Sequence, residues 1–460
     1  MKIGLEVHVQ LNTDTKLFCG CSNKHADEPN TNTCPTCIGL PGSKPRLNRK
    51  AIEFATKIAL AFNCKFSKEM FFSRKVYFYP DLAKDFQITQ YEIPLCTGGH
   101  VMVDKNKILL TRVHMEEDPG RLVHVGSSMQ TAKYVLVDYN RSGTPLCEIV
   151  TEPVFTTPKE ARAFLEHISN MLEYMKVFDS SKDGSMRVDA NISMHSNRVE
   201  IKNITSFKDV EKALTFESIR QKNLHKRNQE VKRETRGWDA AAGITRSQRS
   251  KEEEDDYGYI VDTDLPSITL KKSEIDRLRK ELPEFADEKI KRYVKQFKIP
   301  EKMAESIASS FEAAEMFEEV SKKADERIAA DWFAGIIKKT LNYNSLKLSQ
   351  SKLTSDNVVK LIDMVAKKKI TKRTAEHVIR DMVLKDVDLS SLGETSARIS
   401  TETDLDGLVK EVLDENAQAI IDFKKGRKES FNFLVGQVMR KTRGRGDPEA
   451  IRKLLQKKLK

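Results

Sequence analysis

The sequence predicts an α+β protein in which a mixed-sheet front domain precedes an all-helical domain and a helical tail domain. Three observations predict this fold: period-2 alternation in the first half, helical periodicity in the second half, and a change of composition near residue 270. Eleven of the fourteen prolines and all seven cysteines precede that change, and the later sequence is rich in Lys, Glu, Ala and Leu. We expect domains at residues 1–270, 271–395 and 403–460.

Two segments alternate strictly between apolar and polar residues, which predicts strands with one buried and one polar face. Residues 4–11 place Glu6, His8 and Gln10 between apolar neighbours, and residues 187–194 do the same with Arg187, Asp189, Asn191 and Ser193. Shorter alternating segments occur at Leu110–Glu116 and Leu146–Val150.

Helix signals follow these strands. Thr157, Pro158 and Glu160 form a capping-box pattern with proline at the first helical position. A second helix is predicted after Ser206, and the strongly basic segment Arg220–Arg236 is predicted to be a solvated helix or arm. We expect helices to pack behind the sheet.

The tail is predicted to follow a linker at Ser390–Asp404, which is rich in Ser and Thr. From Asp404 onward, fourteen Lys and Arg residues stand against nine Asp and Glu residues. Three amphipathic helices are predicted there: Leu408–Phe423, Phe431–Arg440 and Pro448–Lys458.

The net charge of +11 favours a polyanionic partner such as nucleic acid, although a basic enzyme without such a partner has the same charge. The amino terminus has no signal-peptide pattern, and no window of 18 residues is apolar enough to span a membrane. We therefore expect a cytoplasmic protein without a membrane partner.

Four cysteines predict a metal site. Cys19 and Cys21 form one short-spaced pair, and Cys34 and Cys37 form a second pair a dozen residues later. Four thiolates close a tetrahedral site around Zn²⁺ and leave no open position, which favours a structural zinc knuckle at residues 19–37. The alternative is four buried free thiols.

Acidic residues gather on the polar strand faces. Glu6 and His8 lie two apart and project from one face, Glu116 and Glu117 precede a Pro-Gly turn, and Glu148 lies inside an apolar run. An unpaired acid in such a run is costly to bury, so Glu148 implies a metal, a cation or proton chemistry. Oxygen ligands with one imidazole suit Mg²⁺ or Mn²⁺. The alternative for each single acid is a solvated face or a salt bridge.

Cations accompany these acids, including Lys75, Arg112, Arg141 and Arg187. A polar sheet with acids and bases suits phosphoryl transfer. The sequence contains no P-loop, no dinucleotide fingerprint and no nucleophile elbow, so any ATP site must be of another kind.

Eight motifs follow one another along the sequence. They are GLEVHVQL, the CGC and CPTC pairs leading into IGLPGSKPRLN, SRKVYFYPDL, HMEEDPGR, DYNRSGTPLCEIVTEP, GSMRVDANIS, VEIKNITSF and ETRGWD. In this order they resemble the B subunit of tRNA-dependent amidotransferases, densely over residues 1–265 and more loosely over the helical rear.

The resemblance implies a cradle-like front domain, a helical domain and a tail domain that docks tRNA. It also implies a reaction in which ATP phosphorylates the side-chain carboxylate of Asp or Glu on misacylated tRNA, and ammonia then displaces phosphate. The implied partners are the amidase, or A, component of the amidotransferase, which supplies the ammonia, its small C component and the tRNA, with no DNA partner. A heterotrimer is therefore expected.

The resemblance also implies roles for single residues. The Mg²⁺ ligands correspond to Glu6, His8, Glu148 and one or both of Glu116 and Glu117, and the Zn²⁺ ligands correspond to the four cysteines. Among these, Glu148 and Glu117 are expected to be catalytic together with Lys75, and Lys75, Tyr79 and Arg187 are expected to line the ATP pocket.

Two positions depart from the family pattern. Cys147 replaces a larger aliphatic residue, and Gly258 stands where an arginine is common.

Three rival interpretations agree less well with the sequence. A related archaeal protein pairs with an asparaginase-like partner, but it carries a large insert for which this chain has no room after ETRGWD. A tRNA-binding module without catalysis would not need Glu6, His8 and Glu148 together. A zinc-ribbon DNA-binding protein would not explain motifs outside the knuckle.

Overall fold

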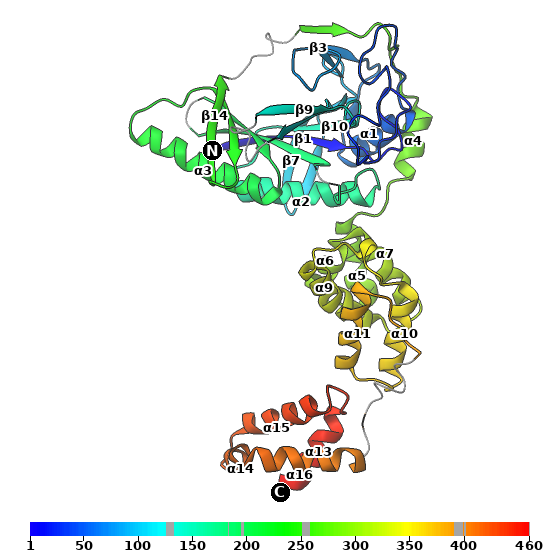
Figure 1. Ribbon diagram of the computed structural model, residues 1–460, viewed down its shortest axis with the longest axis vertical. Helices are drawn as coiled ribbons and strands as arrows, with labels where there is room; N and C mark the ends of the chain where they lie inside the picture. The colour runs from blue at the N-terminus through cyan, green and yellow to red at the C-terminus, as the bar shows by residue number, and fades with distance from the viewer. Residues whose placement is uncertain are drawn as a thin grey trace. The chain divides into compact units, whose positions relative to one another are not determined.

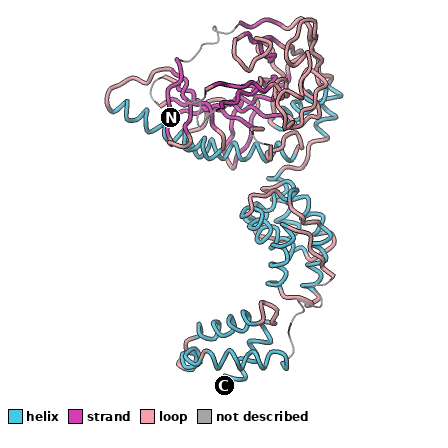
Figure 2. The backbone as a smooth tube through the Cα atoms, in the orientation of Figure 1, coloured by secondary structure: helices cyan, strands magenta, loops and turns pink. Residues whose placement is uncertain are grey.

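The computed structural model describes residues 1–125, 133–182, 184–194, 197–250, 258–390, 399 and 402–459. The chain divides into two compact units, Met1–Pro283 and Glu284–Lys460. Strands occur in the first unit, and the described part of the second unit is helical (Figure 2). The predicted mixed-sheet domain followed by helices is therefore confirmed. Among the described residues, no helix is long and apolar enough to cross a membrane.

The strands of the first unit form one large sheet and a separate two-stranded ribbon, β8–β9. The main path of the sheet runs β14-β13-β12-β11-β1-β10-β7-β4-β3-β15, and only β12 and β13 pair in parallel among the described strands. The strands are β1 (Lys2–Gln10), β2 (Lys65–Phe66), β3 (Ser73–Val76), β4 (Phe86–Thr89), β5 (Cys96–Thr97), β6 (His100–Val103), β7 (Asn106–Glu117), β8 (Arg121–Val125), β9 (Tyr134–Asp138), β10 (Pro145–Thr151), β11 (Met186–Ser193), β12 (Val199–Ile204), β13 (Glu234–Asp239), β14 (Ile244–Ser250) and β15 (Gly258–Val261).

The alternating segments become the centre of this sheet. β1 lies between β10 and β11, and its apolar residues Leu5, Val7 and Val9 are fully buried. Helices α2 (Pro158–Tyr174) and α3 (Phe207–Lys226) run along one side of the sheet (Figure 1). The apolar sheet face and the two helices thus form the core, and the opposite sheet face carries the polar residues.

The helix α2 begins where the sequence predicts. The Thr157 hydroxyl accepts the Glu160 backbone N–H at 3.2 Å, and proline occupies the first turn. The Glu160 carboxylate reaches back to the Thr156 N–H at 2.8 Å rather than to the cap residue itself. The cap therefore satisfies the helix amides in a variant of the predicted capping box.

The basic segment at the end of α3 differs from the prediction. The helix stops at Lys226, and Arg236 lies in strand β13, where it pairs with Glu234 at 2.8 Å. The prediction of one long helix over Arg220–Arg236 was therefore wrong. The second half of the segment leads into a strand that pairs with β12 and β14.

The first unit extends beyond the composition change at residue 270. Helix α4 (Lys272–Lys280) packs against α1 (Arg49–Ala61), and Arg277 of α4 pairs with Glu53 of α1 at 3.0 Å. The first unit therefore ends after the composition change, because α4, a polar helix with the composition of the later sequence, still belongs to it.

The second unit contains two hydrophobic cores. Residues of the first core lie between Tyr293 and Val383, and those of the second lie between Leu405 and Leu459. The helices are α5 (Ala286–Phe297), α6 (Glu301–Ala308), α7 (Phe311–Ser321), α8 (Glu326–Trp332), the π-helix η3 (Phe333–Ile337), α9 (Lys338–Tyr343), the 3₁₀-helix η4 (Leu348–Gln350), α10 (Ser355–Ala366), α11 (Lys372–Leu384), α13 (Glu402–Glu415), α14 (Ala417–Lys424), α15 (Lys428–Lys441) and α16 (Pro448–Leu459).

One predicted tail helix is divided in two. Asn416 separates α13 from α14, and its side-chain amide donates to the Val412 carbonyl at 2.8 Å. An asparagine that bonds the preceding turn competes with the helix ladder, which explains the break. Residues 391–398, 400 and 401 of the expected linker lie outside the described residues.

Candidate active site and metal centres

The polar face of the sheet brings together residues that are far apart in the sequence. On β1, His8 stands opposite Glu148 of β10 and opposite Arg187 of β11. Glu6 stands opposite Asp189 in the same way. Paired residues of antiparallel strands project from the same face, so these side chains meet on one surface.

The first carboxylate group consists of His8, Glu116 and Glu148, whose ligand atoms all lie within 4.8 Å of one another. The His8 Nδ1 lies 3.0 Å from Glu116 Oε1. A second histidine, His114 of β7, places its Nε2 3.0 Å from Glu148 Oε2. Both carboxylate residues are more than nine-tenths buried, so each depends on a positive partner in this site.

The pKa values of His8 and Glu148 reflect this close pairing of carboxylates with imidazoles. Burial lowers the pKa of His8, but the hydrogen bond to Glu116 and the charge of Glu148 outweigh it and raise the pKa to about 9. Burial also works against ionisation of Glu148, yet the charge and hydrogen bond of His114 hold its pKa well below the usual range. Two buried carboxylate side chains around one imidazole suit a divalent cation.

A second carboxylate group lies beside the first. Glu6, Asp189 and Glu200 have ligand atoms within 4.8 Å of one another. Lys202 binds Asp189 at 2.9 Å and approaches Glu200 at 3.7 Å. Burial raises the pKa of Glu6, and the charges of Glu148 and Glu200 raise it further. Three carboxylates with an ammonium between them have the oxygen-only chemistry of a Mg²⁺ site.

An orphaned polar atom supports the same interpretation. The Asn191 amide nitrogen donates to Glu6 Oε1 at 2.8 Å, and its buried oxygen Oδ1 has no hydrogen-bond partner among the described residues. A buried carbonyl oxygen without a donor is costly, and a cation or its bound water would satisfy it.

The cations at the edge of this face are positioned by Asp118. The buried Asp118 carboxylate accepts from Arg187 at 2.6 Å and from Gln10 at 3.3 Å, and it lies 3.5 Å from Arg141. Arg141 also donates to the Pro119 and Gly120 carbonyls at 3.2 and 2.6 Å. Arg187 is thereby fixed next to His8 with about a third of its side chain exposed.

The structure separates Glu117 from its neighbour Glu116. Successive strand residues point to opposite faces, and Glu117 accordingly turns away from both carboxylate groups. It forms an ion pair with Lys84, and its Oε1 accepts the Ile88 N–H at 2.8 Å. Glu117 therefore belongs to a buried ion pair on the other side of the sheet.

Glu117→Gln is expected to lower the free energy of unfolding of the first unit by about 3 kcal/mol, because Lys84 stays buried without its counter-charge. Thermal or urea unfolding checks this, with the exposed Glu69→Gln variant as a control of unchanged stability. Unchanged stability together with lost activity would instead support the predicted catalytic role of Glu117.

The remaining predicted pocket residues lie elsewhere. Lys75 is on β3, three strands away from β10, with its Nζ 5.7 Å from the Tyr77 ring centroid. Tyr79 is half-exposed in the loop after that strand. Gly258 pairs with Val76, and a side chain there would make only an ordinary contact. The roles of Lys75 and Tyr79 stay predictions.

Sequence reasoning overlooked Glu200 and gave Asp189 no ligand role. The signal for Glu200 was present, because Glu200 and Lys202 alternate with Val199 and Ile201 in β12. That pattern predicts a polar face, but it does not say which other strands share it.

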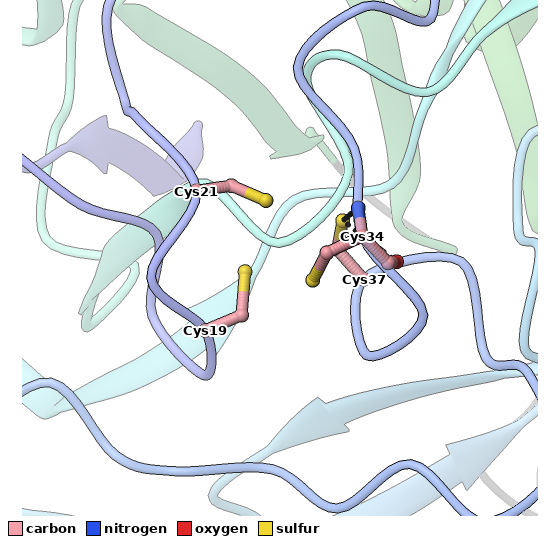
Figure 3. A group of neighbouring side chains, drawn as sticks. All are labelled: Cys19, Cys21, Cys34 and Cys37. Atoms are coloured by element: carbon pink, nitrogen blue, oxygen red, sulfur yellow. Dashed lines mark hydrogen bonds between the residues drawn. The ribbon is translucent and has the colours of Figure 1, made fainter.

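The four predicted zinc ligands converge. The sulfur atoms of Cys19, Cys21, Cys34 and Cys37 lie within 4.8 Å of one another, and all are free thiols (Figure 3). A hydrogen bond from Cys19, the Cys34 N–H at 3.1 Å and the charge of buried Lys16 lower the pKa of Cys37 to about 5. Four sulfur donors at this spacing suit tetrahedral Zn²⁺.

The knuckle also anchors a turn that leads to the polar face. Asn30 donates its backbone N–H to Asp138 at 3.1 Å and accepts the Tyr139 N–H at 2.7 Å. Asn140 accepts the Asn32 N–H at 2.8 Å. The next residue of the turn is Arg141, which lies 3.5 Å from Asp118. Hydrogen bonds therefore connect the cysteine loop to the turn that positions this cation.

Fold and site together define an α+β domain with three residue groups that could hold metal ions, followed by helical modules. The chain belongs to the GatB family: the model described as "GatB/GatE catalytic domain" matches residues 1–276, and the model described as "GatB domain" matches residues 315–459. The resemblance expected from the eight motifs is thus confirmed.

Curated relatives agree over their full lengths. The B subunit of the aspartyl/glutamyl-tRNA(Asn/Gln) amidotransferase of Methanosarcina barkeri is 44% identical, with 100% of this chain and 98% of that protein covered. The B subunits from Methanospirillum hungatei and Haloquadratum walsbyi are 46% and 42% identical, covering 98% and 99% of this chain and 97% and 96% of those proteins. The chain is therefore similar to these relatives along its entire length.

Proposed function

We propose that this chain catalyses the ATP-dependent amidation of Asp-tRNA(Asn), Glu-tRNA(Gln) or both. The side-chain carboxylate oxygen of the tRNA-bound amino acid attacks the γ-phosphorus of ATP, and ADP leaves. Ammonia then attacks the acyl carbon of the resulting acyl phosphate, and inorganic phosphate leaves as the amide forms. The products are Asn-tRNA(Asn) and Gln-tRNA(Gln).

The observation that carries this proposal is the polar sheet face. It holds two adjacent carboxylate groups and is bordered by Arg187 and Lys202, in a chain that matches its amidotransferase relatives from end to end. A tRNA-binding module without catalysis would not require this density of buried acids, because each unpaired charge costs stability.

Mg²⁺ would be held by His8, Glu116 and Glu148 in one group and by Glu6, Asp189 and Glu200 in the other. When bound, it offsets the charge of the ATP phosphates. The chain's own cations complete the site: Arg187 and Lys202 are placed to neutralise phosphate oxygens, and burial of Glu148 keeps the first group away from bulk water. Zn²⁺ would be structural, held by the cysteine knuckle.

The proposal extends to partners and domains. Ammonia would come from the amidase component of the amidotransferase, with the small third component completing a heterotrimer. Residues 1–270 would form the cradle-like catalytic domain and residues 403–460 the tRNA-binding tail domain. The basic composition of the tail supports the last assignment, since phosphate contacts dominate affinity for RNA.

Removal of Asp404–Lys460 is expected to weaken tRNA binding and to make its salt dependence less steep. With fewer Lys and Arg contacts to phosphates, tRNA binding releases fewer counterions. Filter binding at several salt concentrations measures both. Lys424→Gln with Lys425→Gln, two exposed residues at the end of α14, is the fold-preserving comparison. An unchanged slope of log affinity against log salt in both variants would mean that the tail is only a solvated surface.

The proposed reaction is tested with the reconstituted complex, ammonium, labelled ATP and either Asp-tRNA(Asn) or Glu-tRNA(Gln). Ammonium bypasses the amidase, so amidated product isolates the chemistry assigned to this chain. ATP-dependent product identifies the substrate. Intact tRNA binding without product from either tRNA would favour the binding-module interpretation.

A further inference from the structure

The end of helix α3 carries a concentration of positive charge that the proposed reaction does not use. Residues 219–233 contain six Lys and Arg residues and one Glu, an excess of five positive charges compared with eleven for the whole chain. The helix ends at Lys226, and an irregular segment leads from there to β13. This charge lies on the first unit, remote in sequence from the basic tail.

Part of this charge is balanced inside the protein. The fully buried Glu217 accepts two hydrogen bonds from Arg220, at 2.7 and 2.9 Å, and lies 3.5 Å from Arg236. Thr245 and Gln221 satisfy its remaining lone pairs at 3.0 and 2.9 Å. Arg220 is therefore held in one orientation, with about a fifth of its side chain exposed.

Three of the other cations are available to a partner. Lys222, Lys226 and Arg227 are exposed, and none of them forms an ion pair within the described part of the chain. Lys222 and Lys226 lie one helical turn apart, and Arg227 follows Lys226 directly, so these exposed cations repel each other and a polyanion relieves that repulsion.

A shallow groove lies on the same stretch of α3, and Arg227 is the one of these three cations that lines it. Phe216, Ile219 and Leu224 give it an apolar lining, and Arg220, Asn223 and Arg227 supply its polar groups. Its volume is about 260 Å³, below the range typical of sites for larger ligands. About half of the Ile219 side chain is exposed there.

We propose that the groove and the cations Lys222, Lys226 and Arg227 form an RNA-binding surface. The cations contact phosphates, and the groove receives one unstacked nucleobase against Phe216 and Ile219. Aromatic side chains and guanidinium planes are the groups on which unpaired bases stack. The inference rests on the proposed function only in taking tRNA as the RNA.

The charge favours RNA over an acidic protein partner. A protein interface core is depleted of charged residues, and lysine is disfavoured there. Here two arginines line an apolar groove and two lysines lie nearby on the same helix, a concentration of charge typical of a surface that contacts nucleic acid.

The test uses the full heterotrimer and a tRNA(Asn) or tRNA(Gln) transcript. Lys226→Gln with Arg227→Gln is expected to weaken binding about tenfold and to reduce the slope of log affinity against log salt by about 1.5. Lys105→Gln with Lys107→Gln is the matched control with unchanged binding, since both residues are exposed, Lys105 in the turn before β7 and Lys107 near the start of β7. An unchanged slope in the α3 variant overturns the proposal.

A second variant tests the groove. Ile219→Ser is expected to weaken tRNA binding about fivefold and to leave binding of a blunt RNA duplex unchanged, because the duplex offers no unstacked base. Equal loss for both RNAs overturns the nucleobase assignment. Loss of the amidase component from the complex would instead identify a protein interface and overturn the RNA proposal.

The amidation assay with ammonium separates this proposal from the proposed function. A wild-type complex that amidates tRNA, with an unchanged slope in the α3 variant, overturns the RNA surface alone. A complex that binds tRNA through α3 but forms no product overturns the proposed reaction and leaves the surface in place.

Discussion

Glu148→Ala is expected to abolish amidation, by about a thousandfold or more in kcat, while tRNA affinity stays within about twofold. Glu148 lies at the centre of the first carboxylate group, between His8 and His114, and its side chain is almost fully buried. Its removal takes one of two carboxylates from that group and leaves His114 without its acid. The tRNA contacts proposed for the tail and for α3 involve other residues.

The measurement is single-turnover amidation with ammonium, together with filter binding of the same tRNA. Glu148→Gln keeps the side-chain volume and separates the loss of charge from a packing defect. Glu152→Gln is the matched control, because Glu152 directly follows the same strand and its carboxylate accepts an exposed hydrogen bond from Thr111. Equal losses of amidation and tRNA binding would contradict the metal-ligand role.

Cys37→Ser is expected to remove bound zinc and to destabilise the first unit by roughly 3 kcal/mol, as for other losses of a structural metal. Hydrogen exchange in the turn Asp138–Gly143 should also become faster, because Asn30 and Asn32 hold that turn from the cysteine loop. Metal analysis, thermal unfolding and exchange mass spectrometry measure the three effects.

Cys64→Ser is the control for the zinc prediction, since Cys64 is a free thiol outside the knuckle. It should keep its zinc and show unchanged exchange in the turn. A Cys37 variant without zinc but with native stability would mean that the knuckle contributes nothing to this unit.

Much of the fold is encoded locally. The alternation around Glu6 and His8 predicts the strand β1 and its polar face, because side chains of a strand alternate whatever its neighbours are. Thr157 and Pro158 predict the start of α2 because a cap acts within one turn. The cysteine pairs predict their own convergence, since short loops bring such residues together at little entropic cost.

Local sequence patterns predict only part of the candidate site. Glu117 follows Glu116 directly, and the sequence pattern alone does not tell which of them faces His8. The structure answers this through strand register: Glu116 stands opposite Leu146 and Glu117 opposite Pro145. Glu200 was missed because its strand joins the sheet beyond β11, a contact that no local pattern encodes.

The sequence by itself determined the class of elements, the four-cysteine knuckle, some acids of the polar face, including Glu6 and Glu148, and the family. The tertiary structure alone decided the strand order that places β1 between β10 and β11, and with it the division of the acids into two groups. It also decided that α3 ends in an exposed basic groove. Periodicity fixes which way a side chain points, but only long-range pairing fixes what it meets.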